Sequence, residues 1–109
     1  MKSFHLADLF THRFTARPYV EFIREPSMSV GLYVLPAGAP DGQLPHGEDE
    51  VYVVIGGRAE FTAGASTRPV QPGDTIFVGA GQPHHFHDIT EELRLIVVFA
   101  PAEGTQPVQ

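Results

Sequence analysis

The sequence contains no cysteine and few basic residues. The absence of cysteine excludes disulfide scaffolds, thiolate zinc sites and cysteine nucleophiles. It also fits a reducing compartment, and we expect a cytoplasmic protein. Seven Lys and Arg stand against 13 Asp and Glu, for a net charge of -6. Because the basic residues are scattered and never cluster, we expect no nucleic-acid partner.

Long apolar runs are also missing. No stretch approaches the roughly 20 apolar residues that a membrane-spanning helix needs, so we expect no membrane partner. The first nine residues hold no sustained apolar run and meet an acid at Asp8, which is not typical of a secretory signal. At 109 residues the chain has the length of one domain.

Ten prolines and eleven glycines separate short runs of β-branched and aromatic residues. Short strands with turn residues at this spacing are typical of an all-β sandwich or barrel. Gly56-Gly57 fits the two-residue loop of a tight hairpin. The expected strands cover residues 19–24, 28–35, 51–55, 58–63, 67–71, 75–78, 84–88 and 93–100.

Less regular structure is expected at the two ends of the chain. Asp8 to Phe14 can hold one helical turn. The tail 101–109 is polar and rich in turn residues, and we expect it to fray.

The first candidate site segment is Pro45-His46-Gly47-Glu48-Asp49-Glu50, directly before the strand that starts at Val51. Residues four apart on an extended strand lie about 13 Å from each other, so His46 and Glu50 can share an ion only if the chain bends between them. Glycine and aspartate suit such a bend. This interpretation places His46 in a loop, Glu50 at the first inward strand position, and Glu48 and Asp49 in the turn. The alternative is a solvated acidic turn.

The second candidate segment is His84-His85-Phe86-His87. Strand alternation puts His84 and Phe86 on one face and the other two histidines on the opposite face. Spacing alone does not choose the face, and a strand histidine can also be a partly buried hydrogen-bonding residue. Two imidazoles and one carboxylate are the usual protein ligands of an open mononuclear metal site.

Together the two segments resemble the two motifs of the cupin superfamily. In the first motif, His46, Glu50 and Gly57 match the second histidine, the glutamate and the closing glycine. In the second motif the matching residues are Gly73, Gly81 and His84, whereas Gly79 replaces a proline and Asp88 an asparagine. The match covers about half the chain directly.

The resemblance implies a single jelly-roll β-barrel over residues 1–100, in which 1–17 form an amino-terminal arm. It implies that His46, Glu50 and His84 point inward as metal ligands, with His85 and His87 outward. It also implies a homodimer, because cupins commonly pair through their sheets or amino-terminal strands.

The chain departs from the pattern at Leu44, which stands at the position of the first motif histidine. The remaining two histidines and one glutamate suit Fe, Mn, Ni or Zn and leave open positions for water or substrate. Gln43 is a possible extra ligand. Because cupins that have lost ligands include metal-free members, an empty site is the alternative.

Alternation from the ligands predicts the remaining lining of the pocket. Leu44, Tyr52, Val54 and Phe86 are the candidate pocket-lining residues, with core packing as the alternative for the two aromatic ones. Such a site would bind a small organic molecule, and the protein would be a metal-dependent dioxygenase or isomerase. The second hypothesis is a non-catalytic ligand-binding or sensing protein. The sequence leaves the catalytic residues open, with Tyr52 as a possible proton donor, and it indicates no organic cofactor.

Overall fold

The computed structural model describes residues 1–12 and 18–107. Almost all of its regular structure is strand, which confirms the all-β prediction. The elements are helix α1 (Leu6–His12) and strands β1 (Tyr19–Glu25), β2 (Met28–Leu35), β3 (Asp49–Ala63), β4 (Ser66–Val70), β5 (Thr75–Val78) and β6 (His84–Ala100).

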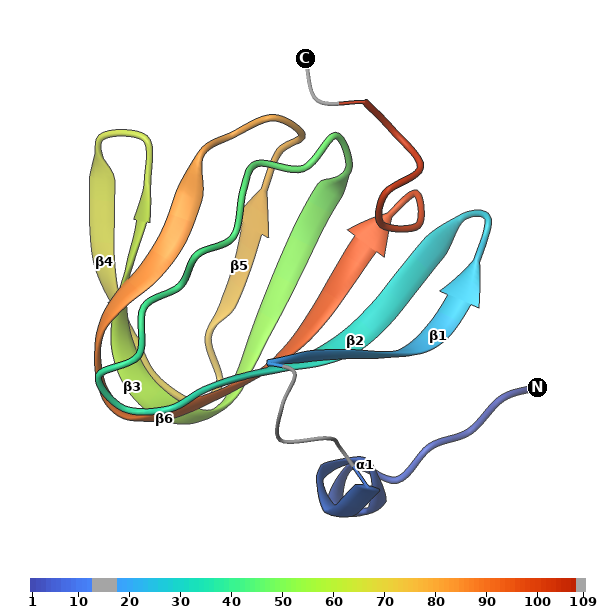
Figure 1. Cartoon of the computed structure of the whole chain (residues 1–109), viewed down its shortest axis with the longest axis horizontal. Helices are drawn as coiled ribbons and strands as arrows, with labels where there is room; N and C mark the ends of the chain where they lie inside the picture. Colours follow the sequence, from blue (N-terminus) through green and yellow to red (C-terminus); the bar gives the residue numbers. More distant parts are fainter. Residues whose placement is uncertain (13–17, 108–109) are drawn as a thin grey trace.

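The strands form one antiparallel sheet in the order β1-β2-β6-β3-β4, and β5 pairs with the first part of β3. The long strands β3 and β6 pair from Asp49↔Ala100 to Ala63↔His84. Figure 1 shows the sheet curling around an interior, with β1 and β2 on one side and β4 on the other. This agrees with the sandwich or barrel that the turn spacing predicts and with the jelly roll that the cupin resemblance implies.

The core follows the two-residue period of the strands. On β6, alternate residues from Leu93 to Phe99 are buried, and on β3 Tyr52 and Val54 are buried. Each such side chain contributes about 1.5–3 kcal/mol when it leaves water. Val54 and Phe86 are core residues and do not line a pocket, so that part of the predicted lining is wrong.

Two predicted strand breaks are absent from the described structure. β3 runs through Gly56-Gly57 and β6 runs through residues 89–92, because register shifts between the two strands absorb the turn residues. Gly57 has φ 93° and Asp88 has φ 49°, which are the backbone conformations that these bulges need. The hairpin predicted at Gly56-Gly57 instead follows Ala63, which pairs with Ser66.

Gly57 should tolerate no side chain. A Cβ atom there would lie 2.2 Å from the Glu92 carbonyl oxygen, on a backbone with positive φ. We expect Gly57→Ala to lower the free energy of unfolding by about 2 kcal/mol in urea titrations. Gly79→Ala is the matched control, since its added Cβ would meet nothing closer than 3.9 Å. Equal effects of the two substitutions would contradict this explanation.

The amino-terminal segment packs on the outside of the sheet. α1 overlaps the helical turn predicted for residues 8–14, although Phe14 lies outside the described residues. Phe4 meets the Phe22 ring edge-on at 5.2 Å, and the Arg94 guanidinium lies 4.8 Å from the centre of the Phe10 ring. These contacts fix the arm on the face of the sheet away from the site.

Candidate functional site

A cavity of about 360 Å³ opens between β1, β2, β6 and the loop that precedes β3. This size is at the lower end of small-molecule sites. Its apolar wall carries three aromatic rings, and its polar lining comes from three segments: the loop before β3, the start of β3 and the segment after β6. The residues concerned are Tyr19, Tyr33 and Phe99, with Gln43, His46, Glu50 and Glu103.

Glu50 and His84 meet at the inner end of this cavity. Glu50 is 2% exposed, and its Oε1 atom lies 2.9 Å from Nε2 of the buried His84. The two atoms are at ion-pair distance, yet Oε1 has no hydrogen bond of acceptable geometry among the described residues. Glu50 pairs with Phe99 and His84 pairs with Ala63, toward opposite ends of the β3–β6 pairing, so the curl of the sheet brings the two side chains together.

The hydrogen bonds around His84 define its protonation. Nδ1 lies 2.7 Å from the Gln82 carbonyl oxygen, which only accepts, so Nδ1 carries a proton. Nε2 lies 3.0 Å from the Tyr52 hydroxyl, which donates its own proton to Gln43 Oε1 at 2.9 Å. This direction of the Tyr52 hydrogen bond favours a proton on Nε2 as well, and so a protonated His84 ring beside the Glu50 carboxylate.

The electrostatic surroundings agree with this assignment. Burial alone would lower the pKa of His84, but the contact with Glu50, the Gln82 carbonyl and the Glu50 charge together raise it above its usual value. Burial, followed by the Glu50 charge, raises the pKa of Tyr52 far above its usual range. Tyr52 is therefore neutral and acts as a hydrogen-bond donor.

Asp41 organises the loop beside this pair. Its carboxylate accepts hydrogen bonds from the Tyr33 hydroxyl at 2.5 Å, the Gln43 side-chain amide at 2.8 Å and the Phe86 backbone N–H at 2.9 Å. Because Gln43 donates to Asp41, its carbonyl oxygen faces Tyr52. The result is a continuous polar network from Asp41 through Gln43 and Tyr52 to His84.

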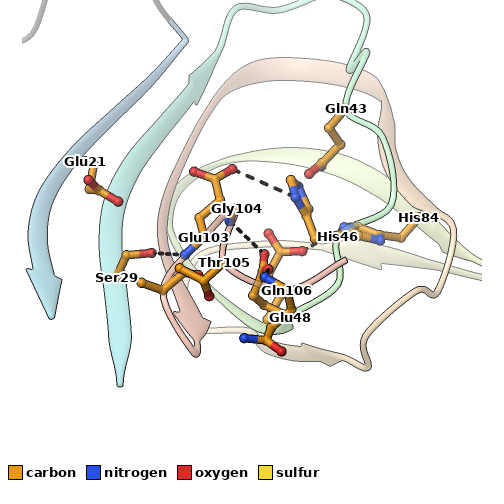
Figure 2. Close-up of polar contacts among 12 residues, drawn as sticks. Glu21, Ser29, Gln43, His46, Glu48, His84, Glu103, Gly104, Thr105 and Gln106 are labelled. Carbon is orange, nitrogen blue, oxygen red and sulfur yellow. Dashed lines mark hydrogen bonds and ion pairs between the residues drawn. The ribbon is translucent and has the colours of Figure 1, made fainter. Parts of the chain in front are cut away.

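The predicted third ligand, His46, lies on the other side of the cavity. Its ring centroid is 6.5 Å from that of His84, and its Nδ1 is 3.9 Å from Oε2 of Glu103 (Figure 2). Two imidazoles on one ion have centroids about 4.5–5.5 Å apart when each metal–nitrogen distance is about 2.1 Å. Among the described residues, no group of three His, Cys, Asp or Glu side chains is arranged to hold a metal.

Glu48 is the main functional residue that sequence reasoning missed. The predicted turn residue is 2% exposed, and its two oxygens accept the backbone N–H groups of Gly104 at 3.1 Å and Gln106 at 2.8 Å. The sequence signal for a buried Glu48 was its two-residue spacing from Glu50, because residues two apart in an extended chain lie on the same face. A side chain would not fit at Gly47, where a Cβ would lie 2.3 Å from the Gln106 carbonyl oxygen.

The carboxyl-terminal segment consequently does not fray over residues 101–107. Ala102 is buried, and the buried Ser29 hydroxyl accepts the Glu103 backbone N–H at 2.9 Å. Figure 2 shows the segment running past Glu48 with the Glu103 side chain directed at His46. Burial raises the pKa of Glu103, His46 lowers it, and the neighbouring acids raise it further.

Two other predictions for the site concern Leu44 and Gln43, and the first needs correction. Leu44 is 77% exposed and does not line the cavity, because the loop turns its side chain to solvent. Gln43 does line the cavity, but its amide is engaged at both ends by Asp41 and Tyr52. Gln43 therefore orients Tyr52, and its role as an extra ligand stays a prediction.

The family model described as the cupin domain matches residues 31–99, more than half of the chain. The chain belongs to the cupin family. This cupin is 49% identical over 105 residues to an uncharacterized protein of Streptomyces coelicolor, a match that covers 95% of this chain and 100% of the relative. The likeness extends along nearly the whole sequence, beyond the two motifs.

Solved cupin structures share the fold at low sequence identity. An uncharacterized Klebsiella pneumoniae protein with a double-stranded β-helix domain superposes with a TM-score of 0.79 at 18% identity, covering 100% of this cupin and 96% of that protein. The cupin domain of Cnp3 from Schizosaccharomyces pombe gives 0.70 at 23% identity, covering 76% of this cupin and 63% of that chain. These structures support the jelly roll and carry no information on the ligand.

The sequence predicts no membrane-spanning helix. In residues 1–12 and 18–107, no helix has the length and apolar character required to cross a bilayer.

Proposed function

We propose that this cupin binds a small organic molecule in the cavity, and that Glu50 and His84 hold a divalent transition metal at the cavity's inner end, with His46 as the third ligand. The observation that carries the proposal is the pair of buried donor atoms, Glu50 Oε1 and His84 Nε2, which face each other at 2.9 Å. Two donors so close in a buried site suit a cation that would replace the Nε2 proton.

The donor set fits a metal of the Fe, Mn, Ni or Zn class in three respects. Glu50 Oε1 is a buried acceptor that forms no hydrogen bond with the described residues. His84 Nδ1 donates to the Gln82 carbonyl oxygen, the usual arrangement that orients a histidine whose other nitrogen binds metal. His46 lines the same cavity as Glu50, so a rotation of its ring away from Glu103 would complete two histidines and one carboxylate.

A bound metal of this class would supply Lewis acidity to an oxygen-bearing ligand, as a dioxygenase or isomerase requires. The chain's own residues would orient the ligand and exclude water from it. Tyr52, neutral and hydrogen-bonded to Gln43, would present its hydroxyl beside the His84 ring. Tyr33, Tyr19 and Phe99 would cover the apolar part of the ligand.

A metal-free ligand-binding or sensing protein is the second candidate, and one observation favours it. The polar groups beside Glu50 have protein partners: His84 contacts the Gln82 carbonyl and Tyr52 and lies 2.9 Å from Glu50, and His46 lies 3.9 Å from Glu103. A buried imidazolium–carboxylate pair of this kind is stable without an ion only while both partners are present.

Elemental analysis of protein without a polyhistidine tag separates the two candidates. We expect about one metal ion per chain in the wild type, and at least about a tenfold loss in Glu50→Ala, because one of the three ligands is gone. Glu91→Ala is the control, since this exposed glutamate lies outside the cavity lining. Substoichiometric metal in the wild type that Glu50→Ala leaves unchanged would favour the metal-free candidate.

The homodimer stays a prediction. Exposed apolar side chains on the arm and on β5, Phe4 and Phe77, are 47% and 66% exposed and are available for subunit contact. Light scattering at micromolar concentration would test it, and a clean monomer would contradict it.

A further inference from the structure

The carboxylate of Glu103 is held at the cavity by the anchored backbone on both sides of it. The Ser29 hydroxyl accepts a hydrogen bond from the Glu103 N–H. The Glu48 carboxylate accepts hydrogen bonds from the N–H groups of Gly104 and Gln106 (Figure 2). Arg24 donates to the Glu103 carbonyl oxygen at 3.0 Å. On the side of the carboxyl-terminal segment, all of these hydrogen bonds involve main-chain atoms. The Glu103 side chain is therefore left to face the cavity and His46.

The aromatic rings that line the cavity are steeply inclined to one another. Tyr19 lies 6.2 Å from Tyr33 at 71° and 6.2 Å from Phe99 at 82°, and His46 packs against Phe99 at 4.8 Å and 70°. Gly31 leaves room for the Tyr19 ring, since a Cβ there would lie 2.3 Å from Tyr19 Cζ. Edge-to-face pairs set the edge of one ring against the face of another, and any ring face left open to the cavity would attract an organic cation.

The charged groups of the cavity lining are predominantly acidic. Glu50 and Glu103 line it, whereas within the described part of the chain no Lys or Arg does. Arg24, which reaches the tail, forms an ion pair with Glu21 at 2.9 Å. Glu50 is engaged by His84, or by the metal in the proposed function, so Glu103 is the remaining carboxylate of the lining, and its nearest basic side chain among the described ion pairs is His46, at 3.9 Å.

We infer that the cavity selects a small organic cation of the ammonium type, which the Glu103 carboxylate and the rings of Tyr19, Tyr33 and Phe99 recognise. The inference rests on the proposed function, because it names the ligand class of the same cavity. Glu103 is the specificity-determining residue. Glu48 and Ser29 are positioning residues, since they fix the main chain that carries it.

Three probes of one shape and different charge test this inference. Calorimetric titration at low salt would use choline, its neutral carbon isostere dimethylbutanol, and the anion dimethylbutyrate. We expect choline to bind with a dissociation constant at least about tenfold lower than that of dimethylbutanol, the effect of one cation–π and carboxylate contact. Dimethylbutyrate should bind more weakly than either.

Glu103→Gln should remove most of the preference for choline over dimethylbutanol and leave the binding of dimethylbutanol within about twofold. Its fold should persist, because the tail is anchored through the backbone, and circular dichroism would check this. Glu91→Gln is the matched control and should keep the full preference. Tyr19→Leu is a second variant, which removes one ring from the cavity wall and should weaken choline more than dimethylbutanol.

The outcomes separate this inference from the proposed function. Equal binding of choline and dimethylbutanol to the wild type would overturn the cation inference while leaving a small-molecule site. A preference that survives Glu103→Gln would overturn the role of Glu103. If none of the three probes binds, the inference is wrong, and the metal content of the wild type and Glu50→Ala still decides the proposed metal site.

Discussion

Glu48→Ala should destabilise the protein by about 3 kcal/mol, because it removes the carboxylate that accepts two backbone N–H groups of the carboxyl-terminal segment. Hydrogen bonds to a charged acceptor are worth about 1.5–3 kcal/mol each, and the two N–H groups would have no replacement until the segment detaches. In a domain of this size the melting temperature should fall on the order of 10–20 °C.

The neighbouring acid provides the control. Asp49 is exposed, and its side chain accepts a hydrogen bond from the Ala80 N–H at 3.0 Å, so Asp49→Ala should cost about 1 kcal/mol or less. Hydrogen exchange gives a second readout, since the Gly104 and Gln106 amides should exchange faster in Glu48→Ala and stay protected in Asp49→Ala. Similar melting temperatures for the two variants would mean that the tail is not anchored by Glu48.

Asp41→Ala should also cost about 3 kcal/mol, because three donors lose their common acceptor at once. The Tyr33 hydroxyl, the Gln43 amide and the Phe86 N–H all converge on this carboxylate. Without the Asp41 carboxylate, Gln43 is no longer oriented toward Tyr52. The hydrogen-bond network from Asp41 through Gln43 and Tyr52 to His84 is then interrupted at Gln43. Urea unfolding measures the loss of stability, and the proton chemical shifts of the His84 ring report the change at the site.

Asp74→Ala is the comparison for Asp41. The Asp74 side chain accepts a hydrogen bond from the Gln71 N–H at 2.9 Å in a turn, so its replacement should cost about 1 kcal/mol. Tyr33→Phe removes a single donor from Asp41 and should cost a similar amount. If Asp41→Ala is no more destabilising than Asp74→Ala, the loop is held by other contacts.

The sequence predicted the fold class well because its information is local. Alternating apolar residues, together with proline and glycine between them, located β1, β2, β4 and β5 to within a residue or two at each end. The two failures, at Gly56-Gly57 and at residues 89–92, have one cause. Glycine and polar residues favour a turn in isolation, but a long partner strand supplies hydrogen bonds through the bend and converts each turn into a bulge.

The same distinction between local and long-range information applies to the residues of the site. Alternation left the face of His84 open, and the resemblance to the cupin motifs implied that Glu50 and His84 point inward; both are buried in the structure. The motif spacing did not distinguish Glu48 from Asp49, since both are acids in the same short segment. Only the return of the tail across this segment decides that Glu48 is buried and Asp49 exposed.

By itself, therefore, the sequence determined an all-β cupin barrel and the two strand positions that carry the buried ion pair. The tertiary structure decided which polar residues surround that pair: Asp41 through the loop, and Glu48 and Glu103 through the tail. The physical reason is that a buried carboxylate is stable only where donors from distant segments converge on it, and such convergence depends on how the chain folds back.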